Sequence, residues 1–352
     1  MQKSYSFSNT EQLLFAQRLR MLLVAGVPLI SIVRLLRVRT HASAGFRKVL
    51  EQVESSVFAG HSLAAALKGA GSAIDGWGLA IIEAGESSGA LAEHVGYWQQ
   101  QMQARVALAR QLRTALVYPL VVLCLLVLQL GVLYWFILPR LLPLFSSLRY
   151  ELPLATRMLL AGYSGIAHYW LWGLVFCAML VPLARYLQVR GVAARLFDFC
   201  ALHMPIVRGI YSSYQSWVLS QSMGVLLQTG MPLMKALHLT QRVVQSYTFR
   251  LQLERVAAEV SAGMSVSQSF KRQLHHAPAE LLELVAAGEH SGQLAASCMQ
   301  SAAYLFETIQ FRLVQLSALF EPALLLFVAC CVGFVAFAII SPLYGITQSI
   351  HY

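Results

Sequence analysis

The chain has 352 residues, of which 57% are hydrophobic and only 12% are charged, whereas soluble domains carry about 25% charged residues. This composition excludes an ordinary water-soluble fold and predicts a membrane protein. The net charge of +10 does not indicate nucleic acid by itself, because basic residues that flank apolar spans account for it more simply, and we expect no nucleic-acid partner.

The first predicted helices are separated by glycine and proline. A helical pattern from Phe15 ends at Gly26, and Pro28 lies in the first turn of the next helix. The same arrangement returns at Gly230 and Pro232, 204 positions later. The chain therefore contains the same turn in both halves.

A second pair of matched turns follows. A third helix is predicted to end at Gly60, and Ser62 is placed to cap a short fourth helix. Gly263 and Ser265 take these places in the second half, 203 positions later. We interpret these residues as helix ends and helix caps rather than as a binding site.

The strongest internal match is the turn after the fifth helix of each half. The octapeptide AGESSGAL at positions 84–91 returns as AGEHSGQL at positions 287–294. The candidate residues of the two copies are Gly85, Glu86, Ser88 and Gly89, and Gly288, Glu289, Ser291 and Gly292. We expect the glycines to shape the turn, and Ser88 and Ser291 to be the N-caps of the long helix that follows.

The paired glutamates have four possible roles. Glu86 and Glu289 were both retained while most surface positions diverged between the halves. Each fits a cap of the following helix, an ion pair with arginine, a ligand of a hard cation, or a contact with a partner protein. The sequence leaves these alternatives open.

Three apolar segments are long enough to cross a bilayer core of about 30 Å. The first and third are copies, because Pro119 matches Pro322 and Pro139 matches Pro342, each 203 positions later. The first proline of each pair is predicted to loosen the helix near its entry into the membrane, and the second to end it. The middle segment has no copy. Two parallel copies can share one orientation only if a return span connects them.

These patterns predict an all-α polytopic membrane protein with two repeated six-helix-type bundles and three transmembrane helices. Basic residues are more frequent beside the bundles than in the short loop, which places both bundles and the N-terminus in the cytoplasm. The predicted order is a cytoplasmic bundle at 1–113, a span at 114–138, a periplasmic loop at 139–157, a span at 158–184, a second cytoplasmic bundle at 185–317, a span at 318–341 and a periplasmic tail at 342–352.

Complete signatures of catalysis are missing. None of the lysines follows a glycine, so there is no Walker loop, and HExxH is absent. The spacing GxSxG occurs once, as GESSG at positions 85–89, but a nucleophile elbow needs a strand before the serine, and this segment is predicted to lie between two helices. The two aspartates, Asp75 and Asp198, lie in the predicted cytoplasmic segments, which excludes an intramembrane aspartyl peptidase. We therefore expect no enzyme activity and no cofactor. The six cysteines form no CxxC pair, and we expect neither a disulfide framework nor a metal site.

Three further groups of residues have both a structural and a functional interpretation. Glu321, at the entry of the last span, is either a functional ionisable group or a residue that reaches the interface. The basic residues Arg34, Arg37 and Arg39 fit a lipid-facing patch or a solvated helix face. The cluster around His275, His276 and Glu280 resembles a metal site only loosely, and solvated helix ends are the default reading.

The ordered motifs resemble the family of type II secretion F proteins and type IV pilus platform proteins. The resemblance rests on the L-x3-G-x-PL entries, the GxS turns, the AGE-x-SG-x-L turns and the Pro-entered spans, over about residues 12 to 345. Longer members have a further N-terminal segment, and the short form resembles the type IVb pilus branch.

The resemblance implies a non-catalytic platform in the bacterial inner membrane that couples a hexameric cytoplasmic assembly ATPase to the insertion of pilin subunits into a fibre. It implies as partners that ATPase, a pilin or pseudopilin, other inner-membrane assembly proteins, membrane lipid and further copies of the chain. The alternative is a transporter subunit built from parallel repeats. Three spans with almost no polar groups make a poor substrate path.

Overall fold

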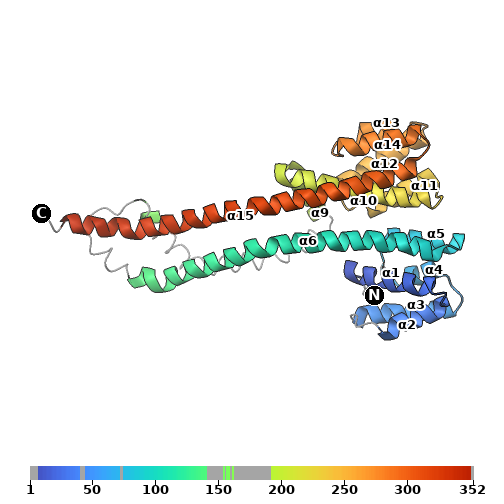
Figure 1. Cartoon of the computed structure of the whole chain (residues 1–352), viewed down its shortest axis with the longest axis horizontal. Helices are drawn as coiled ribbons and strands as arrows, with labels where there is room; N and C mark the ends of the chain where they lie inside the picture. Colours follow the sequence, from blue (N-terminus) through green and yellow to red (C-terminus); the bar gives the residue numbers. More distant parts are fainter. Residues whose placement is uncertain are drawn as a thin grey trace. The chain divides into compact units, whose positions relative to one another are not determined.

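The protein is described from a computed structural model, in residues 7–39, 44–71, 74–140, 154, 156–158, 161 and 192–349. Every regular element in these residues is a helix (Figure 1). The chain forms two compact units. Unit 1 comprises Met1–Gln111 and Ala194–Arg312, and unit 2 comprises Leu112–Ala193 and Leu313–Tyr352.

Six helices begin the chain. They are α1 (Asn9–Val24), α2 (Leu29–Arg39), α3 (Ala44–Phe58), α4 (Leu63–Gly69), α5 (Gly76–Ser88) and α6 (Leu91–Val132). Polar side chains fix three of the starts. Ser8 and Glu11 form a capping box at α1, while Ser62 and Asp75 accept hydrogen bonds from backbone N–H groups of α4 and α5.

The second set of helices follows in the same order after one additional helix. The additional helix is α9 (Val192–His203), and the others are α10 (Pro205–Gln228), α11 (Leu233–Val243), α12 (Tyr247–Ser261), α13 (Val266–Gln273), α14 (Ala279–His290) and α15 (Leu294–Ser349). Ser246 and Ser265 cap α12 and α13. The Ser62 cap of α4 therefore has its counterpart at α13.

The glycine turns have nearly the same backbone geometry in both sets. Gly26 and Gly230 have φ of 73° and 77°, and Gly60 and Gly263 have φ of 88° and 92°. Residues with a Cβ rarely adopt this left-handed conformation, which explains why glycine occupies all four positions.

Aromatic side chains pack the helices of each set onto its long helix. Phe15 on α1 lies edge-on to Trp98 on α6, with ring centroids 6.0 Å apart. In the second set Trp217 on α10 packs against Phe306 on α15 at 5.8 Å. Phe15, Trp98 and Trp217 are all buried. Because large rings bury the most apolar area, these contacts anchor both cores.

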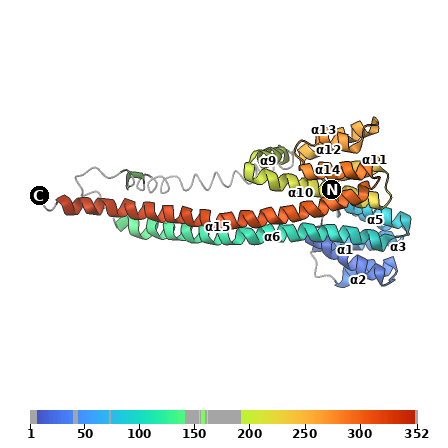
Figure 2. The ribbon, with the colours of Figure 1, turned by 45° about the horizontal axis from the view of Figure 1, so that its top comes forward.

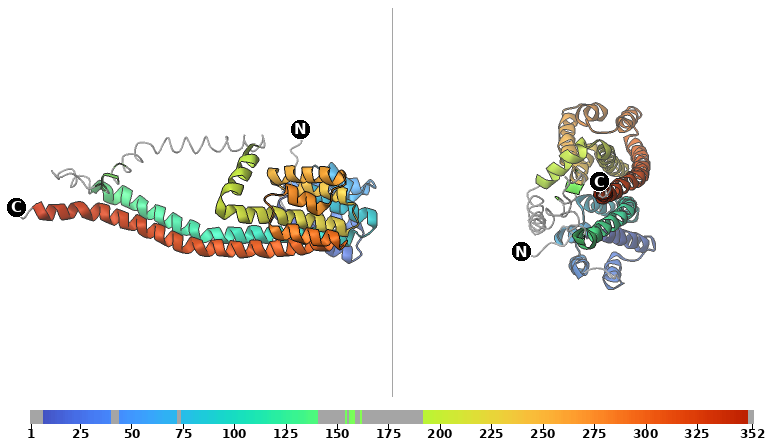
Figure 3. Two further views of the ribbon diagram at one scale, coloured as in Figure 1. Left: turned by 90° about the horizontal axis from the view of Figure 1, so that it is seen from above. Right: turned by 90° about the vertical axis from the view of Figure 1, so that its left-hand side faces the viewer.

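The two sets meet within unit 1. Gln101 on α6 donates a hydrogen bond to Ser222 on α10 at 3.4 Å, and α5 packs against α11. α10 and α6 run antiparallel there (Figure 3). Every residue of α10 from Gln215 to Leu226 is buried, so this helix is covered on all sides.

The long helices α6 and α15 continue into unit 2, where they lie side by side (Figures 1 and 2). Leu91–Arg140 and Leu294–Ser341 each contain a stretch long and apolar enough to cross a membrane, with mean hydropathies of 2.6 and 3.0. Only 6% of either stretch is buried in the protein. A core helix of a soluble protein would be mostly buried, so this exposure favours contact with lipid.

The prediction that Pro342 ends the last helix is wrong, whereas the same prediction for Pro139 is not tested, because the described residues stop one position beyond it. A π turn, η1 (Leu133–Ile137), precedes Pro139, and helical structure continues to Arg140. The wider turn opens the helix where the proline ring would otherwise contact the carbonyl four residues earlier. α15 likewise continues through Pro342 to Ser349.

A side chain compensates for Pro342. Proline has no N–H, so the carbonyl of Ala338, four residues earlier, loses its helical partner. The buried Thr156 hydroxyl donates a hydrogen bond to this carbonyl at 2.7 Å. Apart from a few residues near this contact, the predicted loop at 139–157 and span at 158–184 lie outside the described residues, as does the end of the predicted tail at 342–352.

Candidate functional site at the paired glutamate turns

The repeated glutamates bind the start of a helix that precedes them in the chain. The Glu86 carboxylate accepts hydrogen bonds from the N–H groups of Leu63 and Ala64, at 2.6 and 3.0 Å. The next N–H group, of Ala65, donates to the hydroxyl of Ser62. Since the first amides of a helix have no partner within it, Ser62 and Glu86 together complete the N-terminus of α4.

The second copy repeats these contacts. Glu289 accepts from the N–H groups of Val266 and Ser267 at 2.6 and 2.8 Å, and Ser265 accepts from Gln268. In both copies the glutamate lies 23 positions after the first amide that it binds. The hypothesis that the glutamates cap the following helix is therefore wrong, because they cap α4 and α13 instead.

The electrostatics of Glu289 agree with this geometry. Partial burial acts to raise the pKa of its carboxyl group, but the hydrogen bonds from Ser267 and Val266 outweigh burial and hold the pKa below its ordinary value. The nearby His290 acts in the same direction. The carboxylate is thus charged at neutral pH, and each of its oxygens accepts an amide hydrogen bond in a position that also favours negative charge.

The glycine before each glutamate allows two helices to approach closely. A Cβ on Gly85 would lie 2.9 Å from the Cβ of His94, and a Cβ on Gly288 would lie 2.5 Å from the Cβ of Ser297. Both distances are shorter than atoms tolerate. Gly85 and Gly288 therefore set the packing of α5 on α6 and of α14 on α15, which positions the glutamates.

The serines have a different role from the one predicted. Ser88 lies in the last turn of α5 and donates to the carbonyl of Ala84 at 2.8 Å, and Ser291 donates to Gly288 at 3.3 Å. They stabilise the end of one helix and do not cap the start of the next. The following residues, Gly89 and Gly292, both have φ of 70° and end these helices in the left-handed conformation.

The predicted entry residues lie on the long helices. Pro119 is half-buried within α6, while Glu321 and Pro322 are exposed in α15. Among the described residues Glu321 has no hydrogen bond or ion pair. Its role at the membrane surface stays a prediction.

Two of the three basic residues on α2 share one ion-pair partner within the bundle. Arg34 and Arg37 each form an ion pair with Glu54 on α3, at 3.2 and 3.1 Å. These exposed contacts favour the solvated helix face over a lipid-facing patch.

The cluster around His275, His276 and Glu280 does not form a metal site. Burial, more than the nearby positive charges, lowers the pKa of His276. The described residues contain no group of ligands able to hold a metal ion.

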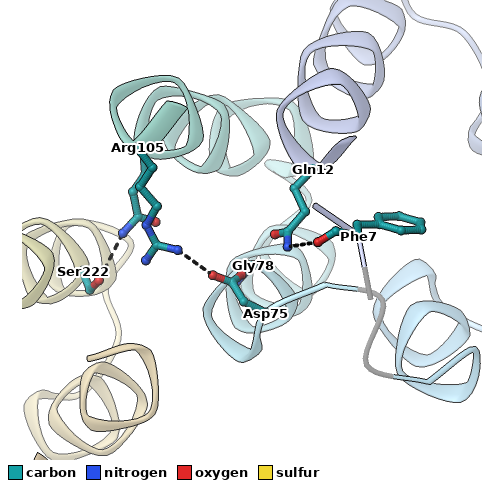
Figure 4. Close-up of polar contacts among 7 residues, drawn as sticks. Phe7, Gln12, Asp75, Gly78, Arg105 and Ser222 are labelled. Carbon is teal, nitrogen blue, oxygen red and sulfur yellow. Dashed lines mark hydrogen bonds and ion pairs between the residues drawn. The ribbon is translucent and has the colours of Figure 1, made fainter. Parts of the chain in front are cut away.

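Both aspartates have structural contacts that the sequence reading missed. Asp75 caps α5 and also accepts a hydrogen bond from Arg105 at 3.1 Å (Figure 4). The figure also shows the amide of Gln12 donating to the carbonyl of Phe7 beside α1. A lone aspartate directly before a helix is a recognisable N-cap signal.

Asp198 fixes α9 to the second bundle. It is buried and accepts hydrogen bonds from the hydroxyls of Tyr211 and Ser246 and from the N–H of Thr248. Burial, with a smaller contribution from Asp198, raises the pKa of Tyr211. Arg195 on the same helix lies over the ring of Tyr247, 4.4 Å from its centroid. The sequence signal for this role is that Asp198 is the only acidic residue of α9.

These contacts give the carboxylates a structural role. Glu86, Glu289, Asp75 and Asp198 each bind at least two donors from the protein. The repeated turns are therefore built as joints between helices.

Known proteins match this chain over most of its length. The family model for "Type II secretion system (T2SS), protein F" matches residues 15–139 and 219–342. The type IV pilus assembly protein TapC of Aeromonas hydrophila is 25% identical over 333 residues, which is 94% of this chain and 79% of that protein. Type II secretion system protein F of Pseudomonas aeruginosa is 25% identical over 341 residues, and type IV pilus assembly protein PilC of the same species is 25% identical over 334 residues. This chain covers 82% and 88% of their lengths, and the alignments cover 95% and 94% of this chain.

Proposed function

Because the chain belongs to the type II secretion system protein F family, we propose that it is an inner-membrane platform protein of a type IV pilus or type II secretion machine. In this role it couples a cytoplasmic assembly ATPase to the insertion of pilin subunits into a fibre. The observation that carries the proposal is the family match, whose two segments each run from the bundle helices through the apolar stretch of a long helix.

The proposed topology has three spans and two cytoplasmic bundles that are copies of one six-helix unit. The exposed apolar stretches of α6 and α15 support the first and third spans. Both helices leave their bundles in the same chain direction, so a return span between them is required. The basic residues next to the bundles support a cytoplasmic location for both bundles and for the N-terminus.

A platform role fits the polar contacts of the bundles. The acidic side chains described above hold helix ends, and a protein that transmits motion between partners needs stiff joints of this kind. We propose that the bundles contact the ATPase and that the spans receive a pilin or pseudopilin from the bilayer. We propose other inner-membrane assembly proteins and membrane lipid as its further partners.

Deletion of the gene tests the function. The expected result is loss of surface fibres, or of secretion, while pilin is still made and processed. Complementation with the unaltered gene is the control and restores assembly. Intact fibres and intact secretion in the deletion strain would contradict the platform role.

Insertion of reporter tags tests the topology. A tag near Tyr150 is expected in the periplasm and a tag near Gln252 in the cytoplasm. Accessibility to a membrane-impermeant reagent in intact cells distinguishes the two locations. Protection of the tag near Tyr150 would refute the three-span arrangement.

A further inference from the structure

The junction between the two bundles uses one face of α10, and the equivalent face of α1 is open. Ser222, in the middle of the α10 face, bonds to Gln101 on α6. Val218 and Val225 lie on the same face, one helical turn to either side, and both are buried. Their counterparts on α1, 204 positions earlier, are Leu14 and Met21. Leu14 is exposed, and Met21 is 64% exposed against 0% for Val225.

The face of α6 that contacts α10 has a counterpart on α15, and this counterpart is exposed. On α6 the face contains Gln101 and Leu108, which lie two turns apart and are both buried. The counterparts on α15, 203 positions later, are Tyr304 and Phe311. Tyr304 is 45% exposed, and Phe311 is 63% exposed against 3% for Leu108. Two aromatic side chains thus lie on the surface at positions where the first copy is covered.

The two open faces have the register of the existing junction. Because α6 and α10 run antiparallel, the Gln101–Ser222 contact fixes which residues lie opposite one another. Transferred to the second copies, the same register sets Tyr304 opposite Arg18. Leu14 then lies opposite Thr308, between Tyr304 and Phe311 and one turn from each. An apolar side chain in this position fills a hole between residues of the facing helix.

From these observations we propose that α1 of one chain packs against α15 of a second copy, in the way that α10 packs against α6 within a chain. The faces occupy the same positions in the repeat as two surfaces that pack together within the chain, and each chain has one of each. Their central residues differ, because Arg18 and Tyr304 replace Ser222 and Gln101, and Arg18 is half-buried. A contact of this head-to-tail kind closes into a ring when its rotation allows, and two copies are the smallest closed number.

Membrane orientation is compatible with this assembly. Both long helices continue toward the apolar stretches in the same chain direction, so the operation that relates the bundles keeps the direction of α6 and α15. Repetition of this operation between chains leaves every copy with the same orientation in the bilayer. The inference depends on the duplicated junction and is independent of the proposed role in pilus or secretion assembly.

Cross-linking in membranes tests the interface. One full-length copy carries Arg18→Cys and one epitope tag, and a second carries Tyr304→Cys and a different tag. A short bis-maleimide is expected to give a product that contains both tags. The unaltered chain controls for the native cysteines. Gln103→Cys with Glu307→Cys in one chain, at two exposed positions that line the same pocket, controls for the reactivity and reach of the reagent, and its cross-link must survive cleavage of the chain between the bundles.

A charge placed in the interface provides a second test of the proposal. Leu14→Asp is expected to lower the yield of the two-tag product about tenfold, since a loss of about 1.4 kcal/mol corresponds to that factor. The control is Phe58→Asp, because Phe58 is also an exposed apolar residue, at 74% against 39% for Leu14, and its counterpart Ser261 is exposed as well. If Leu14→Asp fails to accumulate, Tyr304→Asp tests the other face of the same contact.

Three results would overturn the proposal. They are the absence of the two-tag product when the Gln103–Glu307 control reacts, a predominant cross-link between two copies of Tyr304→Cys, and a yield unchanged by aspartate at either face. Each result would mean that the exposed faces of α1 and α15 contact a different partner or lipid.

Discussion

Replacement of Glu289 by alanine removes the acceptor for two amides at the start of α13. A hydrogen bond to a charged group contributes about 1.5–3 kcal/mol when buried. Glu289 is only partly buried, and water can replace part of each bond, so we expect the loss to total about 2 kcal/mol. A free-energy change of this size corresponds to about 30-fold faster local opening. Glu289→Gln keeps one acceptor oxygen and is expected to give an intermediate effect.

Hydrogen exchange followed by mass spectrometry measures this opening. The peptide that covers residues 263–275 should exchange about 30-fold faster in Glu289→Ala than in the unaltered chain. The control is Glu283→Ala, because Glu283 is an exposed residue of the same helix with no hydrogen bond or ion pair among the described residues. A local probe is preferable to global unfolding, since a protein with several structural units need not unfold in one step.

The pH dependence has a defined sign. The folded-state pKa of Glu289 lies below its ordinary value, so the carboxylate stabilises the folded bundle above pH of about 4.5. This stabilisation is lost as the pH falls through the lower folded-state pKa. The ratio of exchange rates between Glu289→Ala and the unaltered chain should therefore approach one under acidic conditions.

The cap would be refuted by unchanged exchange of this peptide in Glu289→Ala. If fibre assembly were lost at the same time and the protein level stayed normal, the glutamate would have to act through a partner protein. Loss of both protection and protein level would instead support the structural role derived above.

Other contacts lead to further predictions. Gly288→Ala should destabilise the second bundle by about 1–3 kcal/mol because its Cβ meets the next helix, and Gly292→Ala by about 1 kcal/mol because only backbone conformation is strained; protease resistance of the full chain ranks the two. Thr156→Val should reduce thermal stability in detergent, and the reduction should be smaller in a Pro342→Ala background, where the helix again supplies an N–H. Burial raises the pKa of the Cys298 thiol to about 12, so maleimide should label it only after denaturation; rapid labelling of the native protein would contradict its burial.

The sequence by itself determined much of this protein. Glycines at matched positions marked the helix ends because few other residues adopt the left-handed conformation, and the structure shows Gly26 and Gly230 in it with φ of 73° and 77°. The apolar stretches of α6 and α15 were recognisable because crossing a bilayer requires length and composition alone. The order of these motifs also identified the family.

Only the tertiary structure decided what the polar side chains do. Glu86 and Glu289 bind amides 23 and 22 positions earlier, and no local pattern reveals a partner at that distance because the fold alone brings the helices together. Ser88 appeared to be an N-cap from its place before a helix, but α5 extends far enough to include it. The open faces of α1 and α15 were equally hidden, since a duplicated sequence cannot show which copy of a surface is covered.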